Sequence, residues 1–400
     1  MSDLLHTKIF PSGKCPSEKR KPDNYDPLPW SDYFNYREDL ETDVGTFRIY
    51  RRGVEGPLLF FLHGGGFSAL SWSVLSKAIT EEVKCQCLAM DIRGHGDTVT
   101  TDDNDLSADT LAKDVGRIVM TMYPTEAPPI ILIGHSMGGA IAIHSAVKSV
   151  VPSLVGLVVI DVVEGSALDA LYSMNNYLHS RPSVFKSLQH AIEWSFKSNQ
   201  IKNIESAKVS FPGQLKCMST NLPATKDVEV FMKMSLKSRH DSDLIDDRPA
   251  ILAVEAIPEL DEEKDEQLSN TNHKDLHNIY SKRKDLNSNQ QSKQKESRYT
   301  WRIDLTQTEP YWKGWFKGMS HMFLTIPQPK LLILAGIDRM DKLLMIGQMQ
   351  GKFQMHVIPQ AGHAVHEDVP EKVADCLANF LVRNRFTEAK ASCEKPTPSC

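Results

Sequence analysis

The chain has 400 residues, of which 41% are hydrophobic and 24% are charged, with a formal net charge of −5. This composition is typical of a globular protein with one large or two smaller domains. It excludes a nucleic-acid binder with a broad basic face. No apolar run is long enough to span a membrane, and the first residues lack a secretory signal. We therefore expect a soluble protein of the cytoplasm, the nucleus or both, with neither nucleic-acid nor membrane partners.

The seven cysteines form an odd, scattered set without a Cys-x-x-Cys pair. This pattern favours reduced thiols over a disulfide framework or a zinc site.

The first 40 residues are rich in Pro, Lys, Ser and Asp, and they predict an irregular N-terminal arm. Residues 46–50 then alternate polar and apolar side chains, which is typical of an antiparallel edge strand. Residues 57–62 form a continuous apolar run that predicts a strand buried on both faces. This run leads into the sequence His-Gly-Gly-Gly at residues 63–66.

Helices and strands alternate beyond this point, which predicts a mostly parallel sheet flanked by helices. The expected helices cover residues 72–79, 107–122 and 140–147, and the expected strands cover residues 85–90, 129–133 and 154–161. Two more strands are expected at residues 330–338 and 353–359, followed by an amphipathic helix at 371–385 and a loose tail at 387–400. The core therefore consists of residues 41–164 and 328–386.

Residues 165–327 interrupt this core. From about 165 to 240 the sequence predicts helices without strands, which we interpret as a cap over the sheet. Residues 261–298 contain few apolar side chains, namely Leu268, Leu276, Ile279, Tyr280 and Leu286. Such a stretch cannot bury enough apolar surface to offset its ordering entropy, so we expect a disordered internal loop at about 241–298.

The sequence Gly-His-Ser-Met-Gly at residues 134–138 matches the nucleophile-elbow motif Gly-x-Ser-x-Gly. In this motif a serine occupies a strained turn between a strand and a helix, and the flanking glycines permit their close approach. A predicted strand precedes Ser136 and a predicted helix follows it. The context therefore indicates that Ser136 is a nucleophile.

A nucleophilic serine needs a histidine base and a carboxylate that orients it, and in this fold the chain order is Ser, acid, His. His363 follows the last predicted strand, where the base belongs, and His366 is its nearest competitor. Asp161 and Asp338 each end a strand at the same edge of the sheet, and spacing does not decide between them. Asp91 is a poorer choice because it precedes Ser136.

The three consecutive glycines after His63 match a loop that supplies backbone N–H groups to an oxyanion. We expect the donors to be Gly65 or Gly66, together with Met137, the residue after the nucleophile.

Several segments of the chain together resemble the protein phosphatase methylesterases. The most specific are Val-Ile-Asp-Val-Val-Glu-Gly at 159–165, Tyr-Thr-Trp-Arg at 299–302 and Gly-His-Ala-Val-His-Glu-Asp at 362–368. The resemblance covers about residues 45–386 and implies an α/β-hydrolase fold with a helical cap. It also assigns the acid to Asp161, with Asp338 as the alternative.

The resemblance implies a serine esterase that hydrolyses the methyl ester on the C-terminal leucine of the protein phosphatase 2A catalytic subunit. The expected partners are then the C-terminal tail of this catalytic subunit and the phosphatase holoenzyme. The chemistry requires no metal or organic cofactor. Trp194, Trp312 and Trp315 are the candidates for lining a leucine pocket. We also expect docking to complete the site, with His363 too far from Ser136 in the free protein.

Two alternatives share these motifs, namely a general intracellular carboxylesterase or lipase and a binding module on an inactive hydrolase fold. Two further segments are weaker signals. Residues 254–259 resemble a short motif recognised by phosphatase regulatory subunits, and the basic residues 282–284 are a candidate nuclear import signal.

Overall fold

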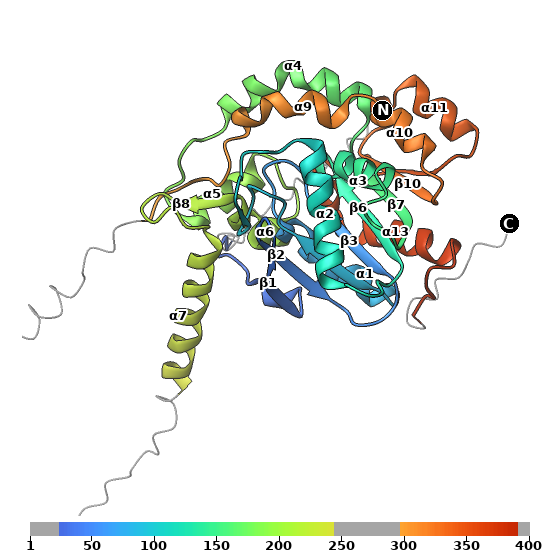
Figure 1. Cartoon of the computed structure of the whole chain (residues 1–400). Helices are drawn as coiled ribbons and strands as arrows, with labels where there is room; N and C mark the ends of the chain where they lie inside the picture. The colour runs from blue at the N-terminus through green and yellow to red at the C-terminus, as the bar shows by residue number, and fades with distance from the viewer. Residues whose placement is uncertain (1–23, 244–296, 391–400) are drawn as a thin grey trace, which may run out of the picture.

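The computed structural model describes residues 24–243 and 297–390 (Figure 1). The predicted disordered loop therefore lies almost wholly outside the described residues, and so do the segments 254–259 and 282–284. The same holds for most of the C-terminal tail and for the first 23 residues.

A mixed, mostly parallel sheet of nine strands forms the centre of the molecule, and this confirms the predicted fold class. Its strand order is β1-β2-β4-β3-β6-β7-β10-β11, with β5 paired to β2. All pairs from β4 to β11 along this order are parallel. The strands are β1 (Tyr36–Thr42), β2 (Gly45–Arg52), β3 (Leu58–Leu62), β4 (Gln86–Met90), β5 (Val99–Thr100), β6 (Ile130–His135), β7 (Leu154–Ile160), β10 (Lys330–Leu334) and β11 (Gln354–Val357).

The edge of the sheet differs from the prediction. Strand β2 is antiparallel as expected, but it lies between β1 and β4, and β1 is the outer strand. The last residues of the predicted irregular arm therefore belong to the sheet. Strand β1 has the sequence YREDLET, whose charges suit an exposed edge but lack the alternation by which a strand is recognised.

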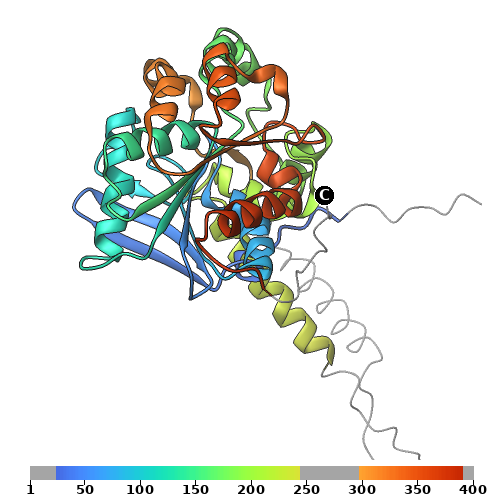
Figure 2. The same ribbon diagram turned by 90° about the vertical axis from the view of Figure 1, so that its right-hand side faces the viewer.

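Helices cover both faces of the sheet (Figure 2). On one face lie α1 (Ser73–Glu82) and α13 (Pro370–Arg383), which pack against each other. On the other face lie α2 (Ala108–Met122) and α3 (Met137–Val147), whose apolar side chains belong to the hydrophobic core on that side of the sheet. The other helical elements outside the insertion are short, namely η1 (Trp30–Asp32), η2 (Ala69–Trp72), η5 (Ile337–Arg339), α11 (Lys342–Met349) and α12 (Val365–Asp368).

The insertion between β7 and β10 covers the carboxyl ends of the parallel strands, and α4 and α9 lie side by side above them (Figure 1). Part of it has a separate hydrophobic core that includes Phe185, Ile192 and Phe211. Its elements are α4 (Glu164–Ser180), α5 (Leu188–Lys197), α6 (Ile204–Ser210), η3 (Phe211–Gln214), α7 (Thr225–Asp243), η4 (Leu305–Thr308), α9 (Glu309–Phe316) and α10 (Met319–Thr325).

The expectation that residues 165–240 contain no strand is wrong. Strand β8 (Leu215–Cys217) pairs antiparallel with β9 (Tyr299–Trp301). Each strand has only three residues, and the partners are far apart in the chain, so neither has a recognisable period. In the part of the chain that the structure describes, no helix has both the length and the apolar character needed to cross a membrane.

Candidate active site

Ser136 lies in a sharp turn between β6 and α3. Its backbone has φ 52° and ψ −121°, a conformation that non-glycine residues rarely adopt. The flanking glycines permit this turn because a Cβ on Gly134 would lie 2.2 Å from the Gly138 carbonyl oxygen, and a Cβ on Gly138 would lie 2.2 Å from that of Leu62. The local sequence thus brings the serine to the end of the central strand and directly before the first turn of a helix.

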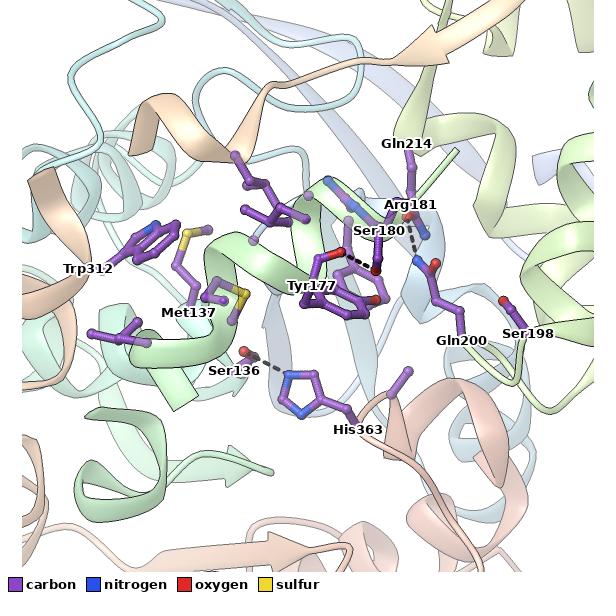
Figure 3. A pocket seen from close by; sticks show the side chains of 18 of the residues that line it. Ser136, Met137, Tyr177, Ser180, Arg181, Ser198, Gln200, Gln214, Trp312 and His363 are labelled. Atoms are coloured by element: carbon purple, nitrogen blue, oxygen red, sulfur yellow. Dashed lines mark hydrogen bonds between the residues drawn. The ribbon is translucent and has the colours of Figure 1, made fainter. Parts of the chain in front are cut away.

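Ser136, His363 and Asp161 lie in hydrogen-bonding sequence. The Ser136 Oγ is 3.0 Å from His363 Nε2, and His363 Nδ1 is 2.8 Å from Asp161 Oδ2 (Figure 3 shows the first contact). Because a carboxylate only accepts, the imidazole donates its Nδ1–H to Asp161, and Nε2 is then free to accept the serine proton. The expectation that His363 lies too far from Ser136 in the free protein is wrong for this structure.

Asp161 follows β7 directly, and its side chain is fully buried. Its Oδ1 accepts from the Ala335 N–H at 2.9 Å, and its Oδ2 also contacts the guanidinium of Arg339. Burial alone raises the pKa of this carboxyl group, but the His363 hydrogen bond, the Ala335 N–H and Arg339 outweigh burial and hold the pKa below its ordinary value. Asp161 is therefore ionised at neutral pH and able to stabilise an imidazolium.

The alternatives from the sequence lie elsewhere. Asp338 belongs to η5, and among the described residues no hydrogen bond joins it to His363. His366 is buried with its ring against Trp72, at a centroid distance of 4.1 Å. Asp91 accepts backbone N–H groups from Ala69 and Asp97 and thereby holds two loops together.

The glycine loop at residues 63–66 ends beside the nucleophile, and both Gly65 and Met137 line the same cavity as Ser136. Gly66 differs from the expectation because its N–H donates to His95 Nε2 at 3.0 Å. This N–H is not free for an oxyanion, so the expected donor pair narrows to Gly65 and Met137. Met137 begins α3, where the first N–H groups have no intrahelical acceptor.

Sequence reasoning missed the role of His95. Its Nδ1 donates to the Arg93 carbonyl at 2.9 Å, so its Nε2 is the acceptor for Gly66. Burial lowers the pKa of His95 to about 4, which keeps the ring neutral and this acceptor available. The histidine in the Arg-Gly-His-Gly sequence was visible, but its contact with a loop 29 residues earlier was not.

His135 was also missed, although it lies within the motif. Its buried Nε2 donates to the His363 backbone carbonyl at 2.8 Å. This bond joins the strand that carries the nucleophile to the loop that carries the base. His135 therefore helps to fix the distance between Ser136 and His363.

A cavity of about 590 Å³ lies beside Ser136 and His363. One part is apolar, and Figure 3 shows Trp312 and Met137 on this side of the serine. The other part is polar and includes Arg181, Gln200 and Gln214. The three tryptophans named from the sequence all line this cavity, namely Trp194, Trp312 and Trp315.

The fold and this site define a class of protein. The model of the alpha/beta hydrolase family matches residues 59–376, and the chain belongs to that family. The chain is 50% identical over 390 residues to protein phosphatase methylesterase 1 of Mus musculus, covering 96% of this chain and 91% of that protein. The relative from Bos taurus is 51% identical over 378 residues, covering 93% and 90%. The chain is a member of the protein phosphatase methylesterase family, as its motifs predicted.

Solved structures agree with the fold. E-2-(acetamidomethylene)succinate hydrolase matches with a TM-score of 0.57 at 15% identity, over 87% of this chain and 99% of that one. At this identity the likeness supports the α/β-hydrolase architecture alone.

Proposed function

We propose that this chain is a serine carboxylesterase that removes a methyl ester from a protein phosphatase. The observation that carries the proposal is the 3.0 Å contact between Ser136 Oγ and His363 Nε2, in a chain half identical to protein phosphatase methylesterases over nearly its whole length. Membership of this family favours demethylation of the phosphatase over the activity of a general lipase.

The finer proposal concerns the substrate. It is the methyl ester on the C-terminal leucine of the protein phosphatase 2A catalytic subunit, presented free or within the holoenzyme. A cavity beside Ser136 with an apolar part is compatible with a leucine side chain, and Trp312 and Trp315 are the residues we propose to contact it. We also propose that the protein works in the cytoplasm, the nucleus or both.

The mechanism follows from the roles of the three side chains. Ser136 Oγ attacks the ester carbonyl while its proton passes to His363 Nε2, and Asp161 stabilises the resulting imidazolium. The N–H groups of Gly65 and Met137 stabilise the oxyanion. Collapse of the tetrahedral intermediate expels methanol, which takes its proton from His363. Water, deprotonated by His363, then attacks the acyl-enzyme and releases the free carboxylate and Ser136.

The test is release of methyl groups from the methylated phosphatase holoenzyme, compared with hydrolysis of a short acyl ester. We expect turnover of the phosphatase and none by the Ser136→Ala variant. Rapid hydrolysis of the short ester without loss of methyl groups from the phosphatase would favour a general carboxylesterase. A fluorophosphonate probe addresses the binding-module alternative, because only an active serine becomes labelled.

A further inference from the structure

Arg181 is a half-buried cation that the proposed reaction does not use. It lines the same cavity as Ser136 and His363, and its Nε is buried without a hydrogen-bond partner among the described residues. Burial lowers the pKa of Arg181 below its ordinary value, and the nearby Tyr177 and Asp304 do not offset this effect. A buried donor without an acceptor costs free energy, so this side chain is prepared for a partner that comes from outside the chain.

The surrounding sequence fixes the position of the guanidinium. Helix α4 ends at Ser180, and Arg181 has φ −75° and ψ 149° because the residue before a proline avoids the helical conformation. The indole of Trp301 donates to the Pro182 carbonyl at 2.8 Å, and its ring lies 4.1 Å from Arg181 Cζ. Trp301 thus supports the guanidinium of Arg181, which can still donate from its edge to a ligand.

Two amides beside Arg181 are also incompletely paired. Gln200 Nε2 donates to Gln214 Oε1 at 3.4 Å, and the other two amide atoms, Gln200 Oε1 and Gln214 Nε2, are buried without a partner among the described residues. Both residues line the cavity, and Figure 3 shows them with Arg181 on the side away from Trp312. Together they offer one acceptor and one donor, which is what a peptide group needs.

We propose that Arg181, Gln200 and Gln214 form a subsite for an acidic residue of the substrate chain that precedes its esterified C-terminal residue. The planar guanidinium would bind the side-chain carboxylate with two parallel hydrogen bonds, and the two amides would bind the peptide backbone. The inference rests on the proposed function and deepens it, because it adds a charge requirement to the recognition of the tail. It explains why the cavity has a polar part that a leucine does not need.

The test uses fluorescent peptides that end in leucine methyl ester and carry one Glu, or the uncharged isostere Gln, at successive positions before it. Binding is measured to the full chain with Ser136→Ala, which does not consume the ester. We expect one position at which Glu binds about tenfold or more tightly than Gln. This ratio falls to about 1 when Arg181→Met is added, and Arg181→Lys retains part of it because the charge remains without the planar fork.

Arg51→Met is the matched control because it removes an equal charge from another arginine whose Nε is buried without a partner among the described residues, and Arg51 pairs with Glu38 outside this cavity. It leaves the ratio of Glu to Gln binding unchanged. The subsite is refuted if no position prefers Glu, if no peptide binds, or if the preference survives Arg181→Met. It is also refuted if Arg181→Met abolishes only a preference for the free leucine acid over its ester, because the guanidinium would then bind the product carboxylate.

The subsite and the proposed function fail in different ways. Methyl release by the unmodified chain without a preference for Glu overturns the subsite alone. A preference for Glu that depends on Arg181, without methyl release from any peptide or from the phosphatase, supports the subsite and overturns the esterase.

Discussion

At the scale of single residues, the choice between two aspartates decides how the base is held. Asp161 is fully buried and accepts from His363 Nδ1 at 2.8 Å, whereas Asp338 lies in η5 at the surface of the loop after β10. The neighbouring Arg339 contacts Asp161, so this loop supports the proposed acid without supplying it.

Asp161→Asn is expected to lower kcat by about 10⁴ because an amide at this position favours the wrong tautomer of His363. Asp338→Asn is the matched control and leaves kcat essentially unchanged. Methyl release from the phosphatase under substrate saturation measures both. The opposite result, with activity lost only in Asp338→Asn, would show that Asp161 is not the acid.

Asp91 links stability to pH. Burial, together with the nearby charge of Asp97, raises the pKa of this carboxyl group to about 7 in the folded protein, against an ordinary value of 3.8. Between the ordinary pKa of 3.8 and the folded pKa of about 7, the folded state binds a proton that the unfolded state has lost. The free energy of unfolding therefore decreases as the pH rises. The contribution of Asp91 is fully present below about pH 4 and has been lost above about pH 7.

The difference in unfolding free energy between the unmodified chain and Asp91→Asn isolates this effect, because the amide does not titrate. We expect the unmodified chain to become less stable relative to Asp91→Asn as the pH rises from about 4 to about 7. Above about pH 7 the difference is expected to be constant. Urea denaturation at a series of pH values measures it. A difference that stays constant across this range would mean that Asp91 is ionised throughout.

At the scale of elements, the turn from β6 into α3 presents Ser136 only because strand and helix approach very closely. A Cβ on Gly138 would collide with the carbonyl oxygens of Leu62 and His63, which belong to the end of β3 and to the glycine loop at residues 63–66. The glycine therefore sets the position of the nucleophile relative to the expected oxyanion donors.

Gly138→Ala is expected to destabilise the fold by about 3 kcal/mol or more, because backbone atoms cannot move aside as a flexible side chain can. It also slows labelling by a fluorophosphonate probe. Gly314→Ala in α9 is the control, since nothing lies within 4 Å of its added Cβ, and it stabilises by about 0.5–1 kcal/mol. Equal stability of the two variants in urea denaturation would contradict this account.

At the scale of the whole molecule, the first helix of the cap is joined to the later helices of the cap at specific points. Glu164, the first residue of α4, accepts from the N–H groups of Gly318 and Ser320 at 2.7 and 3.1 Å, which joins this helix to the start of α10. A second link is more exposed, where Asn175 donates to Glu309 at 3.1 Å. The first link lies three residues after Asp161 in the sequence, so it holds α10 against the start of the cap, close to the end of β7.

Glu164→Ala is expected to lower the free energy of unfolding by about 1–3 kcal/mol, because it removes the acceptor of two N–H groups. It also raises KM for the phosphatase because α4 lines the cavity. Glu309→Ala removes the exposed link and changes stability by less than about 0.5 kcal/mol. Urea denaturation and steady-state kinetics measure these effects, and a Glu164→Ala variant no less stable than Glu309→Ala would contradict the proposed anchor.

The sequence alone determined the parallel core, the nucleophile turn and the positions of Ser136 and His363. These features depend on local patterns, because a buried parallel strand has a continuous apolar run and a tight turn requires glycine at fixed offsets. Family resemblance added Asp161 as the acid and the expected phosphatase substrate. The edge strand β1 and the short pair β8–β9 were not predicted because neither has a readable period.

Only the tertiary structure decided which polar groups meet. It assigned the N–H of Gly66 to His95, joined His135 to the loop of His363, and brought Arg181 and Trp301 together from positions 120 residues apart. No local rule gives such pairings, since each depends on how separate elements pack. The physical reason is that a buried hydrogen bond is fixed by the distance and angle between two atoms, which sequence spacing does not specify across a folded chain.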